Sequence, residues 1–209
     1  SKAVGMQRTG VRQSVPQGQD REKVEQIVET LCSRGQMRAA AIVQLTRATG
    51  MRLREAILAD LPRLSREAAL YGKINIQDGT KGGRAGASAP RWIKVDDHIR
   101  GALRFALQVS PTDSRNLIAP NESYLNVLQE IAQPAREVLK AHDLKGFHEL
   151  RAAFACERYE QITHHRAPVN GGQCYAIDRR LDLEARMQIS DELGHGRIEV
   201  VAAYIGGRV

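Results

Sequence analysis

The sequence predicts a mainly α-helical protein with a small antiparallel β-sheet, and three observations support this fold class. Apolar residues recur with a helical period over most of the chain, and one central stretch changes to a two-residue alternation. Hydrophobic residues make up 42% of the 209 residues, which is enough to build one sizeable core. We therefore expect one folded domain over residues 21–209. Residues 1–20 mix Gly, Gln, Ser and Pro and are expected to form a tail or linker.

Three helices are expected before the alternating stretch. The first begins at Arg21, and its apolar residues follow the i, i+3, i+4, i+7 pattern of one helix face. The second covers about Met37–Thr49 and ends at Gly50, a residue type that favours the left-handed conformation after a helix. The third covers about Leu53–Leu61 and is expected to end at Pro62, because proline lacks the N–H that continues a helix.

The two-residue alternation predicts the small sheet. Lys73–Gln77 alternates like a half-buried strand, and Arg91–Val95 can pair with it as a hairpin or as part of a three-stranded sheet. The segment Asp78–Pro90 between them is rich in Gly, Ser and Ala and carries Lys81 and Arg84. It is expected to form a basic turn at the tip of the sheet.

Helices return after the sheet and fill the rest of the chain. The segment with two histidines and several glycines, about His164–Tyr175, is expected to be a loop. A kink is expected at Pro134. The helices are predicted at about Asp97–Val109, Ser123–Ala141, Phe147–Ile162, Asp178–Leu193 and Arg197–Ile205.

Charge and cysteine usage narrow the class of partner. The 31 Lys and Arg residues exceed the 24 Asp and Glu residues, which gives a net charge of +7 and a pI near 9.6. Such a chain suits a polyanion such as nucleic acid. The three cysteines are odd in number and far apart, so they do not form a disulfide framework. No apolar run approaches the roughly 18 residues of a membrane span. We expect a soluble, cytoplasmic protein.

Five sequence motifs occur in one order along the chain. Thr49–Glu55 reads TGMRLRE, Lys81 lies in the basic turn, His148–Arg151 reads HELR, Leu193–Gly196 reads LGHG, and Tyr204 follows. In these motifs the chain resembles the phage-integrase, or tyrosine recombinase, family over about residues 22–204. The family signatures are TG-apolar-R-x-x-E, HxLR, and LGH followed nine residues later by a nucleophilic tyrosine. The same nine residues separate the histidine and the tyrosine here.

The resemblance implies that Tyr204 attacks a DNA phosphate, and the residue types suit that chemistry. Transesterification builds negative charge on the nonbridging oxygens, which Arg52 and Arg151 can meet with permanently charged guanidinium groups. His148 lies three residues before Arg151, so both point to the same face of one helix. His195 is expected at a junction between helices, where it can donate to the phosphate. A phenol is protonated at neutral pH, so these cations and histidines must favour the phenolate or accept its proton.

Three further residues receive supporting roles, each with an alternative. Glu55 lies three residues after Arg52 and is expected to orient that guanidinium, although such a carboxylate can also be an ordinary surface residue. Lys81 is expected to act as general acid toward the leaving 5′ oxygen. The alternatives are that Lys81 only contacts backbone phosphates, or that Arg84, which is predicted to bind DNA, takes its place.

The resemblance implies a site-specific DNA recombinase or integrase that cleaves and rejoins strands through a 3′-phosphotyrosine. It implies duplex DNA as partner, a homotetramer on DNA with a monomeric isolated fragment, and neither a metal nor a cofactor. Two alternatives remain open: a DNA-binding module without chemistry, and a type IB topoisomerase-like relaxer with the same active site. A zinc site is disfavoured, because the cysteines and the histidine pair match no common ligand spacing.

The spacing between two motifs departs from the family pattern. Arg151 and His195 are 44 residues apart, which is more than is usual in the family. We therefore expect an insertion at about Glu157–Ala185, as in some prophage or mobile-element integrases. Its Arg179 and Arg180 are predicted to contact DNA or a neighbouring protomer, and a surface elaboration is the alternative. The family usually carries an N-terminal core-binding domain as well, so we expect this chain to be a fragment of a longer integrase.

Overall fold

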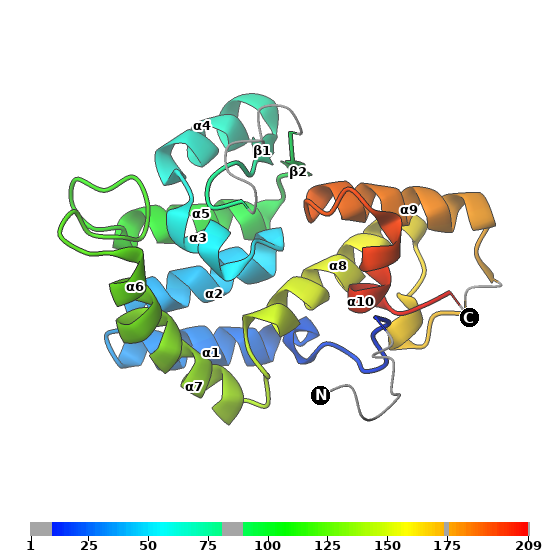
Figure 1. Ribbon diagram of the computed structural model, residues 1–209, viewed down its shortest axis with the longest axis horizontal. Helices are drawn as coiled ribbons and strands as arrows, with labels where there is room; N and C mark the ends of the chain where they lie inside the picture. Colours follow the sequence, from blue (N-terminus) through cyan, green and yellow to red (C-terminus); the bar gives the residue numbers. More distant parts are fainter. Residues whose placement is uncertain (1–9, 81–89, 174–175, 209) are drawn as a thin grey trace, which may run out of the picture.

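The computed structural model describes residues 10–80, 90–173 and 176–208. It confirms the predicted fold class, because the chain is mainly helical and carries a two-stranded antiparallel sheet (Figure 1). Within those ranges, no helix combines the length and the apolar character needed to cross a bilayer. The sheet has two strands in the described part of the chain, so the hairpin alternative fits and the three-stranded one does not.

The core is organised around helix α2, Met37–Thr49, which is buried along most of its length. It packs against α1, Arg21–Ser33, against α5, Asp97–Val109, and against α8, Phe147–Thr163. Helix α2 ends where Gly50 adopts the left-handed conformation with φ of 65°, as its position predicted. Figure 1 shows α8 running from the side of α7 toward α9, so it connects the two halves of the molecule.

The segment after Gly50 differs from the prediction at Pro62. Helix α3, Leu53–Leu58, is short, and a further helix, α4, covers Leu61–Tyr71. The prediction that Pro62 ends a helix is therefore wrong. Pro62 lies in the first turn of α4, where a missing N–H removes no helical hydrogen bond, and the Asp60 side chain caps that turn by accepting from the backbone N–H of Arg63.

The hairpin pairs β1, Lys73–Asn75, with β2, Trp92–Lys94. Ile74 lies opposite Ile93, and both side chains are fully buried against the helices. This inward face fixes the register, because a slip by one residue would turn these isoleucines to solvent.

The helix around Pro134, where a kink was expected, is interrupted by a π-helical turn. Helix α6, Tyr124–Val127, continues through a π-helical turn, Leu128–Ala132, into α7, Gln133–Ala141. Pro134 sits in the first turn of α7 and cannot donate a backbone hydrogen bond. The π-helical turn just before it is a common way to absorb such a break.

The C-terminal part carries α9, Arg179–Glu192, then a 3₁₀ turn at Ile198–Val201 and the short helix α10, Ala202–Ile205. The expected insertion at residues 157–185 corresponds to the end of α8, a loop with a 3₁₀ turn at Pro168–Asn170, and the first half of α9. Both α9 and α10 contact α8. The helices around the expected insertion are therefore packed on the same scaffold as the rest.

Residues 10–20 differ from the expected tail, because they lie against α8. Pro16 and Gly18 are buried, and a 3₁₀ turn covers Gln17–Gln19. Arg12 fixes this segment at two points: its backbone N–H donates to the Ala202 carbonyl at 2.9 Å, and its guanidinium pairs with Glu149 at 2.5 Å. Composition could not predict this packing, because a backbone contact and an ion pair hold the segment instead of an apolar face.

Candidate active site

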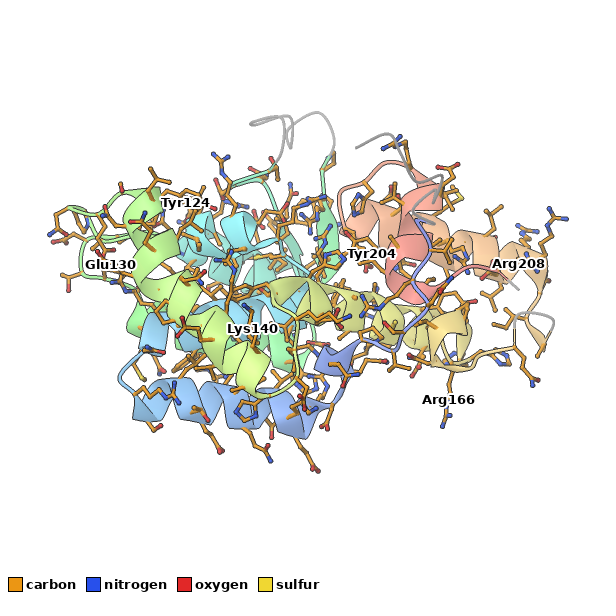
Figure 2. All side chains as sticks on the ribbon, turned by 60° about the horizontal axis from the view of Figure 1, so that its bottom comes forward. Tyr124, Glu130, Lys140, Arg166, Tyr204 and Arg208 are labelled. Carbon is orange, nitrogen blue, oxygen red and sulfur yellow. The ribbon has the colours of Figure 1, made fainter. Side chains whose placement is uncertain are left out.

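Five of the residues singled out in the sequence come together around one pocket. The pocket has a volume of about 360 Å³ and receives residues from the α2–α3 junction, from the start of α8 and from α10. Figure 2 marks Tyr204 on α10, the helix that packs on α8. Arg52, His148, Arg151 and Tyr204 line the pocket, and His195 contacts Tyr204 from the α9–α10 connection.

The Tyr204 hydroxyl is held between a histidine and an arginine. Its Oη lies 2.9 Å from His195 Nε2 and 3.3 Å from Arg151 Nε. The side chain is nearly buried, and its ring contacts His148 and His195 at centroid distances of 5.1 and 5.4 Å. Arg151 can only donate, so it favours negative charge on Oη, while the histidine can accept the phenolic proton. This arrangement suits an activated phenol.

Arg151 is buried and joins three chain segments through its hydrogen bonds. Its Nη1 donates to the Gly50 carbonyl, its Nη2 donates to the Leu193 carbonyl at 2.6 Å, and Nη2 also lies 3.2 Å from His195 Nε2. Burial lowers the pKa of Arg151 to about 10, with the Tyr204 hydroxyl opposing that shift. Arg151 therefore stays protonated at neutral pH.

His195 is oriented by the turn that follows α9. Gly194 adopts φ of 64°, and the His195 backbone N–H donates to the Ser190 carbonyl at 2.9 Å. Burial, followed by the charges of Arg151 and Arg52, lowers the pKa of His195 to about 4. His195 is therefore neutral at neutral pH. Because Arg151 points a donor at Nε2, that nitrogen is an acceptor and the proton resides on Nδ1.

His148 lines the pocket beside Tyr204. It is exposed, on the first turn of α8. Partial burial lowers the pKa of His148, and the positive charges of Arg12 and Arg151 lower it further. With no carboxylate partner in the described part of the chain, the ring of His148 can meet an incoming phosphate.

Glu55 contacts the guanidinium of Arg52. Its Oε1 accepts from Arg52 Nη1 at 2.7 Å, and its Oε2 accepts from the Arg52 backbone N–H at 2.7 Å. Glu55 is fully buried, so the alternative of a surface carboxylate does not fit. Burial raises the pKa of Glu55, but the Arg91 charge and the Arg52 hydrogen bonds outweigh it, and the pKa is lowered overall. Glu55 is thus a buried anion that fixes Arg52.

Arg91 is a functional candidate that the sequence did not reveal. Arg91 is 4% exposed, and its Nη1 lies 2.8 Å from Glu55 Oε2. Its Nε donates to the Glu192 carbonyl at 2.5 Å, and its Cδ would lie 3.0 Å from a Cβ placed on Gly194. Arg91 therefore connects the carboxylate behind Arg52 to the turn that carries His195.

We expect Arg91→Met to lower the free energy of unfolding by about 3 kcal/mol, because removing one partner of a buried ion pair leaves the other charge uncompensated. Urea unfolding measures the loss. The double variant Arg91→Met/Glu55→Gln is expected to be more stable than Arg91→Met alone. The neutral glutamine removes the buried negative charge that Arg91 would otherwise balance. Arg115→Met removes an exposed arginine from its pair with Asp60 and serves as the control, with a loss below about 1 kcal/mol. A loss of that smaller size in Arg91→Met would contradict the buried role.

Two of the predicted residues, Lys81 and Arg84, fall outside the described residues. Two others lie away from this cluster. Arg179 and Arg180 are exposed at the start of α9, one helix length away from the His195 turn, and Arg180 pairs with Glu184. Their predicted DNA contacts therefore belong to a surface separate from the pocket.

No cluster of three or more His, Cys, Asp or Glu side chains suitable for a metal occurs in residues 10–80, 90–173 and 176–208. Cys156 is buried beneath α10, where its thiol lies 3.7 Å from the Tyr204 carbonyl. Burial raises the pKa of this thiol to about 12, so Cys156 is a packing residue.

Comparison with known proteins places the chain in a family. A family model described as Integrase matches residues 10–157, which is most of the chain. The fold and this match define the class of protein, a DNA integrase or recombinase in the general sense. The chain belongs to the phage-integrase, or tyrosine recombinase, family. No curated protein and no solved structure matches it. The matched range includes Arg52, Glu55, His148 and Arg151 and ends before His195 and Tyr204.

Proposed function

We propose that this protein is a site-specific DNA recombinase that cleaves and rejoins duplex DNA through a 3′-phosphotyrosine on Tyr204. One observation carries the proposal: the Tyr204 hydroxyl lies within hydrogen-bonding distance of His195 and of Arg151, in a pocket that Arg52 and His148 also line. Nucleophile, proton acceptor and cationic groups are the parts that a phosphoryl transfer needs.

In the proposed step the Tyr204 oxygen bonds to phosphorus, and the bond from phosphorus to the 5′ oxygen breaks. The phenolic proton passes to His195. Arg52 and Arg151 stabilise the additional charge on the nonbridging oxygens, and His148 donates to the same phosphate. The leaving 5′ oxygen takes a proton from Lys81, or from Arg84 as the alternative. One phosphodiester is exchanged for another, so rejoining needs neither ATP nor a metal in this scheme.

Duplex DNA is the proposed partner, and a homotetramer assembled on DNA is the proposed active form. Arg179 and Arg180 at the start of α9 are proposed to contact DNA away from the cleavage site, or to contact a neighbouring protomer. Both side chains are exposed, which suits either role.

The experiment that tests the proposal uses a pool of nicked duplexes of random sequence, so that the recombination site need not be known. A nick beside the cleaved bond lets the short leaving strand dissociate, which traps the covalent adduct. With EDTA present, we expect an adduct that resists SDS and retains a label placed 5′ of the cleaved bond. An adduct that retains the 3′ fragment would contradict the proposed polarity. DNA binding without any adduct would favour the DNA-binding module instead.

The topoisomerase-like alternative is separated by a second readout. A recombinase joins strands from two different duplexes, whereas a relaxer reseals the strand that it has cut. Products that join two differently labelled duplexes are expected here. Plasmid relaxation with no such products would favour the relaxer.

A further inference from the structure

Two arginines near the pocket rest on aromatic rings instead of on carboxylates. The guanidinium carbon of Arg54 lies 5.6 Å from the ring centroid of Tyr124, and that of Arg136 lies 5.9 Å from the ring centroid of Phe147. In the described part of the chain neither arginine forms an ion pair. Arg136 donates one hydrogen bond, to the neutral side chain of Gln133 at 3.1 Å. Both positive charges therefore remain available.

Several other arginines of this protein have their donors occupied by carboxylates. Arg38 meets both carboxylate oxygens of Glu122, at 2.5 and 2.8 Å, and Arg158 meets both oxygens of Glu192, at 2.6 and 2.8 Å. Such paired arginines hold the fold together. A guanidinium placed over a ring is attracted to it without using up a carboxylate, so its remaining N–H groups can bind an anion such as phosphate.

The two stacked arginines lie on one side of the candidate active site. Arg136, on α7, lines the same pocket as Arg52, His148 and Tyr204. Arg54 is exposed, two residues after Arg52, and its aromatic partner belongs to α6. In Figure 1, α6 and α7 lie on one side of α3 and α8, whereas α9 and α10 lie on the other. A DNA strand entering the pocket from the α6–α7 side would meet these two charges.

We propose that Arg54 and Arg136 bind DNA phosphates that flank the cleaved one on the α6–α7 side, without taking part in the chemistry. The inference rests on the proposed function, because it takes the pocket as the place where the strand is cut. Each guanidinium is presented by a ring from a different helix, so the two contacts are separate. Their contributions to binding are expected to add.

The test measures binding of a fluorescein-labelled duplex by anisotropy over a series of salt concentrations. Arg54→Gln and Arg136→Gln are each expected to reduce the slope of log affinity against log salt by about one phosphate contact. Each is expected to weaken binding roughly tenfold at moderate salt. Arg34→Gln is the matched control, because Arg34 is exposed on α1 without a carboxylate or aromatic partner in the described residues. Its slope is expected to equal that of the unmodified protein.

Two further measurements separate binding from chemistry and from folding. At saturating protein, the rate of covalent adduct formation by each variant is compared with that of the Arg34→Gln control, so that a loss removed by saturation is assigned to binding. Arg136→Lys keeps the positive charge but loses the planar guanidinium. It is therefore expected to keep the salt slope of the unmodified protein and to bind DNA more tightly than Arg136→Gln. The thermal unfolding of each variant is measured as well. Binding is compared only between variants that are folded at the temperature of the assay.

The inference is overturned if Arg54→Gln and Arg136→Gln show the same salt slope as Arg34→Gln. That result would leave the proposed function intact, provided that the unmodified protein forms the covalent adduct. Absence of the adduct from the unmodified protein would instead contradict the proposed function, and the salt slopes would still report whether the two arginines bind DNA.

Discussion

Replacing Tyr204 by phenylalanine is expected to abolish the covalent DNA adduct and to leave DNA affinity within about twofold of the unmodified protein. The substitution removes only the hydroxyl that lies between His195 and Arg151. The ring keeps its place against the two histidines and α8, so the fold is retained. Loss of the nucleophile leaves no group to form the phosphoester.

Tyr124→Phe is the matched control for this prediction. Tyr124 is another tyrosine of the described chain, on α6, and its ring faces Arg54 outside the pocket. Adduct formation is expected to continue at an unchanged rate in this variant. If Tyr204→Phe still formed the adduct, the assignment of the nucleophile would be wrong.

Arg151→Lys is expected to slow adduct formation by at least about a hundredfold at saturating protein, which is the usual cost of losing one transition-state donor. A lysine carries the charge but only one donor centre. It cannot reach the Gly50 carbonyl, the Leu193 carbonyl and the Tyr204 hydroxyl together, as the Arg151 guanidinium does. Because the loss concerns the transition state, the affinity for intact DNA is expected to fall much less than the rate. Single-turnover adduct formation and anisotropy separate the two.

Arg158→Lys provides the comparison on the same helix. Arg158 also makes a two-pronged contact, with Glu192, but it lies outside the pocket. Its adduct rate is expected to stay within about threefold of the unmodified protein. Equal rates in the two lysine variants would indicate that the Arg151 contacts stabilise the fold without serving the reaction.

The helices were predictable where local signals were strong. Helices α2 and α5 begin and end as expected, since a left-handed glycine terminates α2 and the Asp96 side chain caps the start of α5 by accepting from the Ile99 N–H. Pro62 misled the prediction because proline suits the first turn of a helix as well as the position after its end. Only the position of the preceding Asp60 cap distinguishes these two cases.

The motif residues of the candidate site were predictable, whereas Arg91 was not. Its partners, Glu55 and the Glu192 carbonyl, lie far away in the sequence, so no local pattern joins them. A signal was nevertheless present. Two-residue alternation places residue 91 on the same inward face as Ile93 and Val95, and a buried arginine there requires a carboxylate.

The central claim is that Tyr204 becomes joined to DNA, and peptide mapping of the trapped adduct tests it most directly. Trypsin is expected to release the peptide Ile198–Arg208, which contains one tyrosine and no serine, threonine or cysteine. After nuclease digestion, mass spectrometry is expected to find a nucleotide attached to this peptide, with fragment ions that place it on Tyr204. A nucleotide on any other peptide, or an adduct that leaves Ile198–Arg208 unmodified, would contradict the account.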